Sequence, residues 1–147
     1  MTKNVLLSIQ GLQYQEEALN DEELDKIEII CPGEYYFRNQ AHFILYEEQD
    51  DDFEEPVKNM IKVRGNEFTL TKKGPMNVQM VFTEGKKTMT DYATPFGNLM
   101  IALDTSKVMV EETEDKIKIH IDYALEANYQ FIADCRIDIE VAARHDE

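Results

Sequence analysis

The chain has very little cysteine and no long apolar run, and these absences exclude several classes of protein. Cys31 and Cys135 are the only cysteines among 147 residues, so a disulfide scaffold is excluded and both are expected to be buried thiols. No run approaches the roughly 18 apolar residues of a membrane-spanning helix. The N-terminal segment also lacks the apolar stretch and cleavage site of a signal peptide. We therefore expect one cytoplasmic globular domain over residues 1–147, with no membrane partner.

Nucleophiles and phosphate-binding loops are equally scarce. Ser8 and Ser106 are the only serines, and neither lies in a nucleophile-elbow sequence. All six glycines are isolated, which leaves no glycine-rich loop to hold a phosphate. An enzyme would need inward-facing titratable groups with displaced pKa values, and His42, Glu47 and Arg64 are the best candidates for such a set. We predict no catalytic residue and treat an enzyme as the weakest alternative.

Patterns that bind metals are absent from the sequence as well. His42, His120 and His145 are far apart and form no paired motif of the kind that ligates zinc. The acidic stretch 50–55 lacks the glycine turn and the ligand spacing of an EF-hand. We expect neither a metal nor a cofactor.

What the chain has in quantity is alternation of apolar and polar residues. Between Lys116 and Glu126 every second residue is apolar, and 129–141 repeats the pattern except at Ile132. A period of two is typical of strands with one buried face and one wet face. The strands predicted in this way are 3–14, 25–37, 41–49, 57–64, 67–72, 77–83, 87–92, 98–111, 116–126 and 129–141.

Ten strands in chain order, joined by short connections, predict an all-β fold. The expected architecture is a closed, antiparallel up-and-down β-barrel of about 8–10 strands, because a long twisted sheet curls and closure removes its edges. Residues 15–25 have room for at most one short helical turn. Pro32-Gly33 predicts a bulge that lets the barrel bend, and residues 143–147 are expected to fray.

Several short segments resemble a known family. They are the turn Tyr92-Ala-Thr-Pro-Phe-Gly97, which is the most specific, and Tyr46-Glu47-Glu48, Lys72-Lys73-Gly74 and Phe82 near Gly85. Over roughly residues 3–142 the chain resembles the YwiB-like proteins, small bacterial β-barrels of the calycin type with no assigned function. The resemblance implies a closed barrel related in shape to lipocalins and fatty-acid-binding proteins, and it brings no catalytic residues.

The turn at 92–97 also has a local explanation. Pro95 fixes its own φ and favours an extended Thr94, and Gly97 can take a positive φ that other residues avoid. Pro95 and Gly97 are therefore predicted to be structural turn residues. The functional alternative is that Tyr92 and Thr94 line the mouth of the barrel, where a ligand enters.

A small apolar or amphipathic ligand inside the barrel is the first functional hypothesis. Methionines gather in the middle third of the chain and adapt to varied apolar partners, while a barrel of about eight strands is just wide enough to be either hollow or filled. The predicted lining residues are Tyr35, Phe37, Met80, Phe82, Tyr92, Thr94, Leu99, Ile101, Phe131 and Cys135.

The charge of the chain limits its possible partners and suggests where its basic side chains lie. Acidic side chains outnumber basic ones by 30 to 15, for a formal charge of −15, which repels phosphate backbones and excludes nucleic acid as a partner. Residues 47–55 hold seven acids and no base, whereas 58–87 hold seven bases and two acids. These bases are expected on solvated outer faces. The alternative is an anion contact inside the barrel, in which Arg64 or Lys72 pairs with Glu47 or Glu48 and binds a carboxylate.

The uneven distribution of charge, together with apolar residues expected to point outward, indicates an alternative function to ligand binding. In that reading the barrel is filled by side chains and the protein is an interaction module or a homodimer that acts through its outer surface. The outward apolar residues are expected to be Ile44, Val81 and Ile132.

Overall fold

The structure, a computed structural model of the chain, describes residues 3–14, 25–49, 51, 53–95 and 97–144. These residues form ten strands, and none of them belongs to a helix long or apolar enough to cross a membrane. The helical turn expected between residues 15 and 25 lies outside the described residues, as do 145–147 of the tail. The strands are β1 (Asn4–Tyr14), β2 (Asp25–Arg38), β3 (Ala41–Glu48), β4 (Val57–Arg64), β5 (Glu67–Lys73), β6 (Val78–Thr83), β7 (Lys86–Thr94), β8 (Gly97–Glu112), β9 (Lys116–Ala127) and β10 (Gln130–Ala143).

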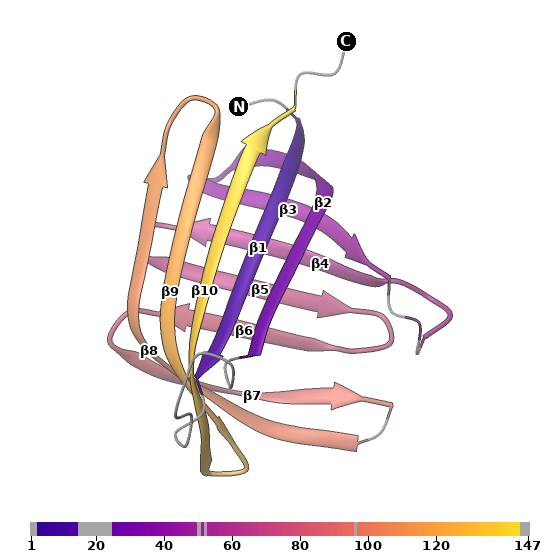
Figure 1. The fold of residues 1–147 in the computed structure, drawn as a ribbon, viewed down its shortest axis with the longest axis vertical. Coiled ribbons are helices and arrows are strands. Elements are labelled where there is room, and N and C mark those ends of the chain that lie inside the picture. Colours follow the sequence, from indigo (N-terminus) through magenta and orange to yellow (C-terminus); the bar gives the residue numbers. More distant parts are fainter. Residues whose placement is uncertain (1–2, 15–24, 50, 52, 96, 145–147) are drawn as a thin grey trace.

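All ten strands belong to one antiparallel sheet, which curls into a barrel. Their order is β6-β5-β4-β3-β2-β1-β10-β9-β8-β7, so the first strand pairs with the last and the beginning of β1 lies beside the end of β10 (Figure 1). Between β6 and β7 the described residues form a single bridge, Asn77 to Ala93, with two backbone hydrogen bonds of 3.0 Å. The predicted up-and-down barrel is confirmed, and it is nearly closed.

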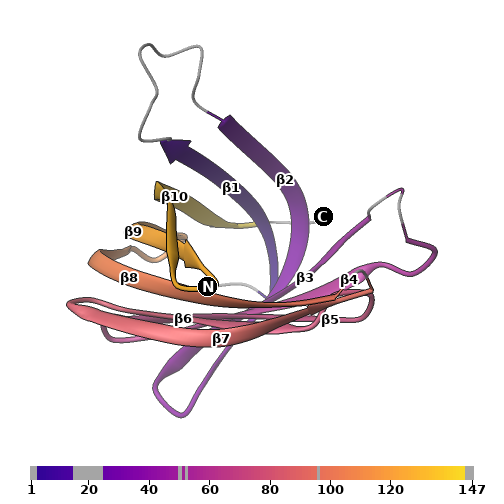
Figure 2. The same cartoon turned by 90° about the horizontal axis from the view of Figure 1, so that it is seen from below.

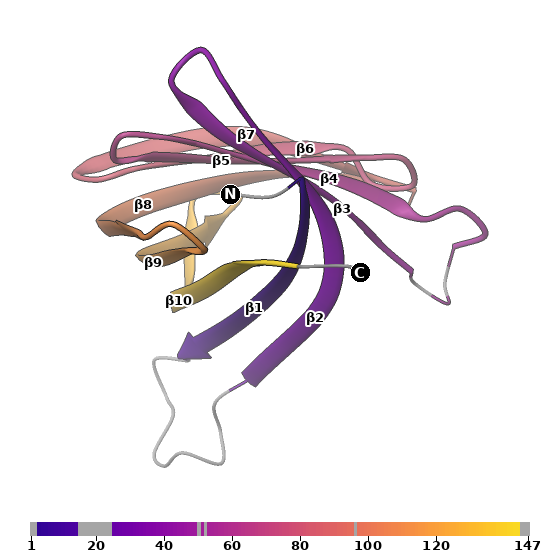
Figure 3. The ribbon, with the colours of Figure 1, turned by 90° about the horizontal axis from the view of Figure 1, so that it is seen from above.

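The barrel is flattened into two layers whose strands cross. In Figure 1, β3–β6 run across the molecule behind β9, β10 and β1, which run lengthwise. Seen from below and above, β3–β7 stack in one layer while β1 and β2 curve away from it (Figure 2 and Figure 3). The inner faces of the two layers face each other, so the core lies between them.

Strand β2 passes from one layer to the other. It pairs with β1 without a register shift from Asp25 to Glu34, and it pairs with β3 from Glu34 to Arg38. The bulge expected at Pro32-Gly33 is therefore wrong, because the strand bends by changing its partner instead. A Cβ at Gly33 would lie 3.0 Å from the Leu45 carbonyl oxygen, so glycine permits the close approach at the bend.

Apolar side chains from both layers fill the interior. The Phe82 ring packs edge-on against Phe68, with centroids 5.8 Å apart, and against Tyr123 at 4.9 Å. Phe82 thereby joins β5 and β6 of one layer to β9 of the other. The fully or nearly buried cluster includes Val5, Leu7, Ile44, Ile61, Val63, Phe68, Phe82, Leu103, Ile117, Ile119, Ile121, Ile139 and Val141.

Two bulges reset the alternation of the C-terminal strands. The β8–β9 register shifts between Thr105 and Lys107, where the sequence interrupts its apolar pattern. The β9–β10 register shifts between Phe131 and Ala133, and Phe131 pairs with Glu126 on the outer face. Because an extra residue reverses the side-chain faces beyond it, the prediction that Phe131 lines the interior is wrong.

Residues 143 and 144 make backbone hydrogen bonds that the sequence does not predict. The Ala143 N–H donates to the Asp115 carbonyl and the Arg144 N–H donates to the Asn4 carbonyl, both at 2.9 Å. Residues 143 and 144 are therefore held by the barrel, contrary to the expected fraying.

We predict that Phe82→Ala lowers the free energy of unfolding by about 3–5 kcal/mol, because it leaves a cavity where the two layers meet. Chemical denaturation followed by circular dichroism measures this loss. Phe37→Ala is the matched control: Phe37 is 59% exposed, so its loss should stay below about 1 kcal/mol. Equal losses would mean that the contact between layers is not centred on Phe82.

Candidate functional site

One end of the barrel interior is polar, and Lys72 is at its centre. The alternation of β3, β4 and β5 turns Glu48, Asn59 and Lys72 to the inner face, and Asn59 pairs directly with Lys72 across the strands. The Lys72 Nζ donates to Glu48 Oε1 at 2.7 Å and to Asn59 Oδ1 at 3.1 Å. The Lys72 and Glu48 side chains are 15% and 26% exposed, and Asn59 is 3% exposed.

The ion pair is completed by hydrogen bonds. Asn59 Nδ2 donates to the Val57 carbonyl at 3.3 Å, so both ends of this amide have a partner. Withdrawing two charges from water costs free energy that their attraction repays only when such bonds are made. A well-packed apolar pair of the same size would stabilise a barrel at least as well, so stability alone does not account for Lys72 and Glu48.

Three titratable groups near Glu48 respond to its charge. Burial raises the pKa of Tyr46, Tyr92 and Cys31, and the Glu48 carboxylate raises each further. The Tyr92 hydroxyl donates to Met76 Sδ at 3.1 Å. At neutral pH both phenols therefore stay protonated.

A cleft of about 600 Å³ opens beside this polar end. It forms because β2 leaves β3 beyond Glu34 and Leu45, so the C-terminal part of β3 has no neighbour on that side within the described residues. Tyr46, Asn59 and Cys31 line its inner wall. The remaining lining residues are Asn4, Pro32, Gly33, Glu34, Leu45, Glu47, Lys58 and Arg144.

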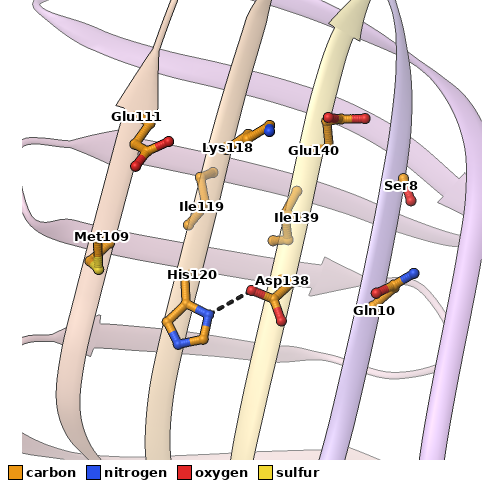
Figure 4. A pocket seen from close by; sticks show the side chains of 10 residues that line it. All are labelled: Ser8, Gln10, Met109, Glu111, Lys118, Ile119, His120, Asp138, Ile139 and Glu140. Atoms are coloured by element: carbon orange, nitrogen blue, oxygen red, sulfur yellow. Dashed lines mark hydrogen bonds and ion pairs between the residues drawn. The ribbon is translucent and has the colours of Figure 1, made fainter.

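A second, smaller depression of about 360 Å³ lies on the outer face of β1, β10, β9 and β8. Figure 4 shows its polar side chains in rows across these strands, with His120 beside Asp138. His120 Nδ1 lies 2.6 Å from Asp138 Oδ1, and His120 Nε2 lies 3.1 Å from Asp122 Oδ1. The Arg136 Nε bonds the same Asp122 oxygen at 3.4 Å.

The carboxylates on both sides of His120 control its charge. The hydrogen bond to Asp138, reinforced by Asp122, raises the pKa of His120 above its usual value, against the opposing effect of partial burial. Both ring nitrogens are occupied by these carboxylates. Among the described residues no group of three Asp, Glu, His or Cys side chains could hold a metal ion.

The structure separates the predicted lining residues into two groups. Tyr35, Phe82, Ile101 and Cys135 are buried, and Met80 packs against the core cluster. Phe37, Leu99 and Phe131 are among the exposed large apolar residues. The buried group is packed into the interior, and Tyr92 is the member that lies near the polar end.

The two predicted anion contacts do not form one site. Lys72 faces the interior and is paired with Glu48, one of the two partners expected for an inward base. Arg64 lies on the outer face, where its Nη2 donates to the Asn39 carbonyl at 2.6 Å. The outward position expected for Ile44 is wrong, because this side chain is 0% exposed and belongs to the core.

The set expected for an enzyme does not come together either. Glu47 and Arg64 are exposed on the outer face, whereas His42 faces inward. The Tyr35 hydroxyl hydrogen-bonds His42 Nδ1 at 2.7 Å, and His42 Nε2 lies 3.2 Å from Glu112 Oε2. His42 is thus held in a polar contact between β2, β3 and β8.

The turn at 92–97 is a tight connection between β7 and β8. Thr94 pairs with Gly97, and Gly97 has a φ of +131°, as the glycine in this turn predicts. Pro95 is exposed at the tip. The Thr94 side chain lies outside the described part of the structure.

Sequence reasoning missed Asn59, although a signal was present. In β4 the alternating positions 57, 59, 61 and 63 hold Val, Asn, Ile and Val. A polar residue at an inner position of an apolar series requires a buried partner. That partner is Lys72, which appears only when β4 and β5 are paired in the correct register.

The fold defines the class of protein as a nearly closed, antiparallel up-and-down β-barrel. The chain belongs to the family described as "Domain of unknown function (DUF1934)", which matches residues 11–139. Its fold is similar to that in the crystal structure of ywiB protein from Bacillus subtilis, with a TM-score of 0.81 and 21% identity over 97% of this chain and 93% of that chain. No curated protein matches the chain. The resemblance found in the sequence is confirmed.

We predict that His120→Gln destabilises the protein at mildly acidic pH and has little effect at alkaline pH. The pKa of His120 is higher in the folded state than the ordinary 6.5, so its stabilisation is fully present below pH 6.5 and is lost as the pH rises through the folded pKa. The loss should reach at most about 1 kcal/mol, as for other exposed ion pairs.

Unfolding in urea across this pH range provides the measurement. Lys118→Gln, on the same face of β9, is the control, because it removes a positive charge and leaves His120 with both of its carboxylates. If both variants show the same pH profile, the two carboxylates do not control the charge of His120.

Proposed function

We propose that this protein binds a small amphipathic ligand at the polar end of the barrel, with Lys72 as the contact for an anionic group. The observation that carries the proposal is the inward-facing Lys72–Glu48–Asn59 cluster beside a cleft of about 600 Å³. Cavities of this size hold small molecules, and a few convergent polar groups in an apolar wall fix the orientation of a ligand.

The packing of the interior supports a site at the end rather than along the barrel axis. Phe68, Phe82, Ile61 and their neighbours fill the space between the layers, so a ligand there would have to displace the core. At the polar end, Lys72, Glu48 and the half-buried Tyr92 retain contact with solvent. Ligand entry there leaves the core intact.

The chemistry of this end supports binding rather than catalysis. Tyr46 and Tyr92 have raised pKa values, so near neutral pH both phenols stay protonated and neither serves as a general base. The Lys72 ammonium already donates to Glu48 and Asn59. Lys72 is the group of this cluster that suits an anion, and the cluster provides no nucleophile paired with a base.

We predict that a small molecule co-purifies with the untagged protein and that Lys72→Met reduces its occupancy at least about tenfold, as expected when a charged contact is lost. Denaturing extraction followed by mass spectrometry measures the ratio of ligand to protein. The matched control is Lys73→Met, because Lys73 is exposed and follows Lys72 on the opposite face of β5.

Full occupancy in Lys73→Met together with loss in Lys72→Met would support the site. Equal occupancy in both variants would place the ligand elsewhere. An empty extract from the wild type, with no binding detected by titration of small carboxylates, would overturn the proposal.

A second candidate function is self-association through the outer face of β3, β4 and the part of β2 that pairs with β3, Glu34 to Arg38. Tyr36 and Phe43 stack there with their centroids 4.8 Å apart and an interplanar angle of 8°, and Tyr36 is 39% exposed. The Lys62 Nζ lies 5.8 Å from the Phe43 centroid. Outer faces of antiparallel sheets are usually polar, so a stacked aromatic pair there favours a partner surface.

We predict that Phe43→Ser weakens a homodimer at least about tenfold, since aromatic anchors dominate interface energies. Sedimentation equilibrium over a wide range of protein concentration gives the dissociation constant. Ile30→Ser serves as the control, because Ile30 is 62% exposed and lies on a strand segment paired with β1. A wild-type protein that stays monomeric throughout would exclude the homodimer.

A further inference from the structure

Of the two residues in the ion pair, Glu48 is more exposed and less firmly held by its surroundings than Lys72. Glu48 is the last residue of β3, its side chain is 26% exposed, and the next residue, Gln49, is exposed. Lys72 belongs to a paired segment of β5, is 15% exposed and also bonds the 3% exposed Asn59. Glu48 can therefore move into water at lower cost than Lys72 can.

The geometry points to Glu48 as an internal substitute for a ligand: we propose that the ligand is a carboxylate that takes the place of the Glu48 carboxylate on Lys72. This inference rests on the proposed function and names the ligand class. Glu48 then competes with the ligand for one ammonium group. Its release to solvent accompanies binding.

The ligand must carry a negative charge, because Lys72 needs an anionic partner once Glu48 has left. A largely buried ammonium such as that of Lys72, 15% exposed, is destabilising when it loses its carboxylate without replacement, so an amine or a neutral molecule does not displace Glu48. Glu48 Oε1 lies 2.7 Å from the Lys72 Nζ, which shows that a carboxylate oxygen fits at this position.

The surrounding side chains limit the apolar part of the ligand. Val78 pairs with Lys72 across the β5–β6 ladder, and both Val78 and Val57 are buried. Two residues before Lys72, Leu70 packs against the core cluster, and beyond it Phe68 is fully buried. A long alkyl chain has no space in this direction, so the ligand is a short or aromatic carboxylate rather than a long-chain fatty acid.

Internal competition lowers the affinity that the wild type shows. The tethered Glu48 occupies Lys72 in most molecules, and the apparent affinity falls by the fraction of molecules in which Lys72 is free. Removing the charge of Glu48 while preserving its shape should therefore increase affinity. A residue that only lines or supports the site would reduce affinity when it is changed.

The test uses the full chain and phenylacetate as the probe, with isothermal titration calorimetry of four proteins. We expect Glu48→Gln to bind phenylacetate at least about tenfold more tightly than the wild type, and the double variant Glu48→Gln/Lys72→Met to lose this gain. Glu67→Gln is the matched control, since Glu67 is exposed at the opposite end of β5 from Lys72 and does not line the cleft, and it should bind as the wild type does. Phenethylamine should not bind any of them.

Carboxylate 13C NMR of the wild type provides a second measurement that needs no variant. Saturating phenylacetate should move the Glu48 Cδ signal to that of a solvated glutamate. An unmoved signal, or a Glu48→Gln affinity equal to or weaker than wild type, overturns the competition even if the co-purified ligand still depends on Lys72. Tighter binding of phenyl phosphate than of phenylacetate would overturn the carboxylate class.

Discussion

The architecture depends on one strand, β2, pairing with a different neighbour at each end. Its N-terminal part continues the ladder of β1 as far as Glu34, and its C-terminal part pairs with β3 from Glu34 onward. This change of partner carries the sheet from one layer to the other at a point where Gly33 approaches the Leu45 carbonyl oxygen. Because β2 cannot pair on both sides along its whole length, a cleft opens next to β3. The candidate site is thus a consequence of how the barrel turns its corner.

The interior combines two environments that are usually kept apart. Most of it is a dry, close-packed contact between two sheet layers, centred on residues such as Phe82 and Ile119. At one end, Lys72, Glu48 and Asn59 replace apolar residues at inner positions. The apolar part accounts for the stability of the barrel. The polar part adds little net stability, and its charged groups are the ones available to recognise another molecule.

Alternation in the sequence predicted the strands closely, because each strand has one buried and one wet face. The strand predicted over 57–64 agrees fully with β4, and most other ends differ by a residue or two. The errors arose where local pattern was overruled by partners distant in sequence. At Phe131 a bulge reversed the faces, and at Ile44 the second layer covered a side chain expected to point outward.

The site was predictable only in part for the same reason. Lys72 and its partner Glu48 were identified as candidates from their charge and their place in the chain. Asn59 and the cleft depend on the register of β4 with β5 and on the divergence of β2 from β3. Neither follows from the order of residues along a single strand. The lining predicted for a hollow barrel included Phe82 and Ile101, which the structure places in the packed interior.

The pairing of β1 with β10 has a consequence for synthesis of the chain. Of the ten strands, β1 leaves the ribosome first and β10 last, and they pair over ten positions from Val5–Ala143 to Tyr14–Asp134. Until β10 emerges, one edge of β1 has no partner in the finished order of strands. Contacts between distant parts of a chain form slowly because their loop-closure entropy must be overcome first. An unpaired strand edge is prone to pair with other chains, so the nascent barrel is exposed to misassembly until β10 has emerged.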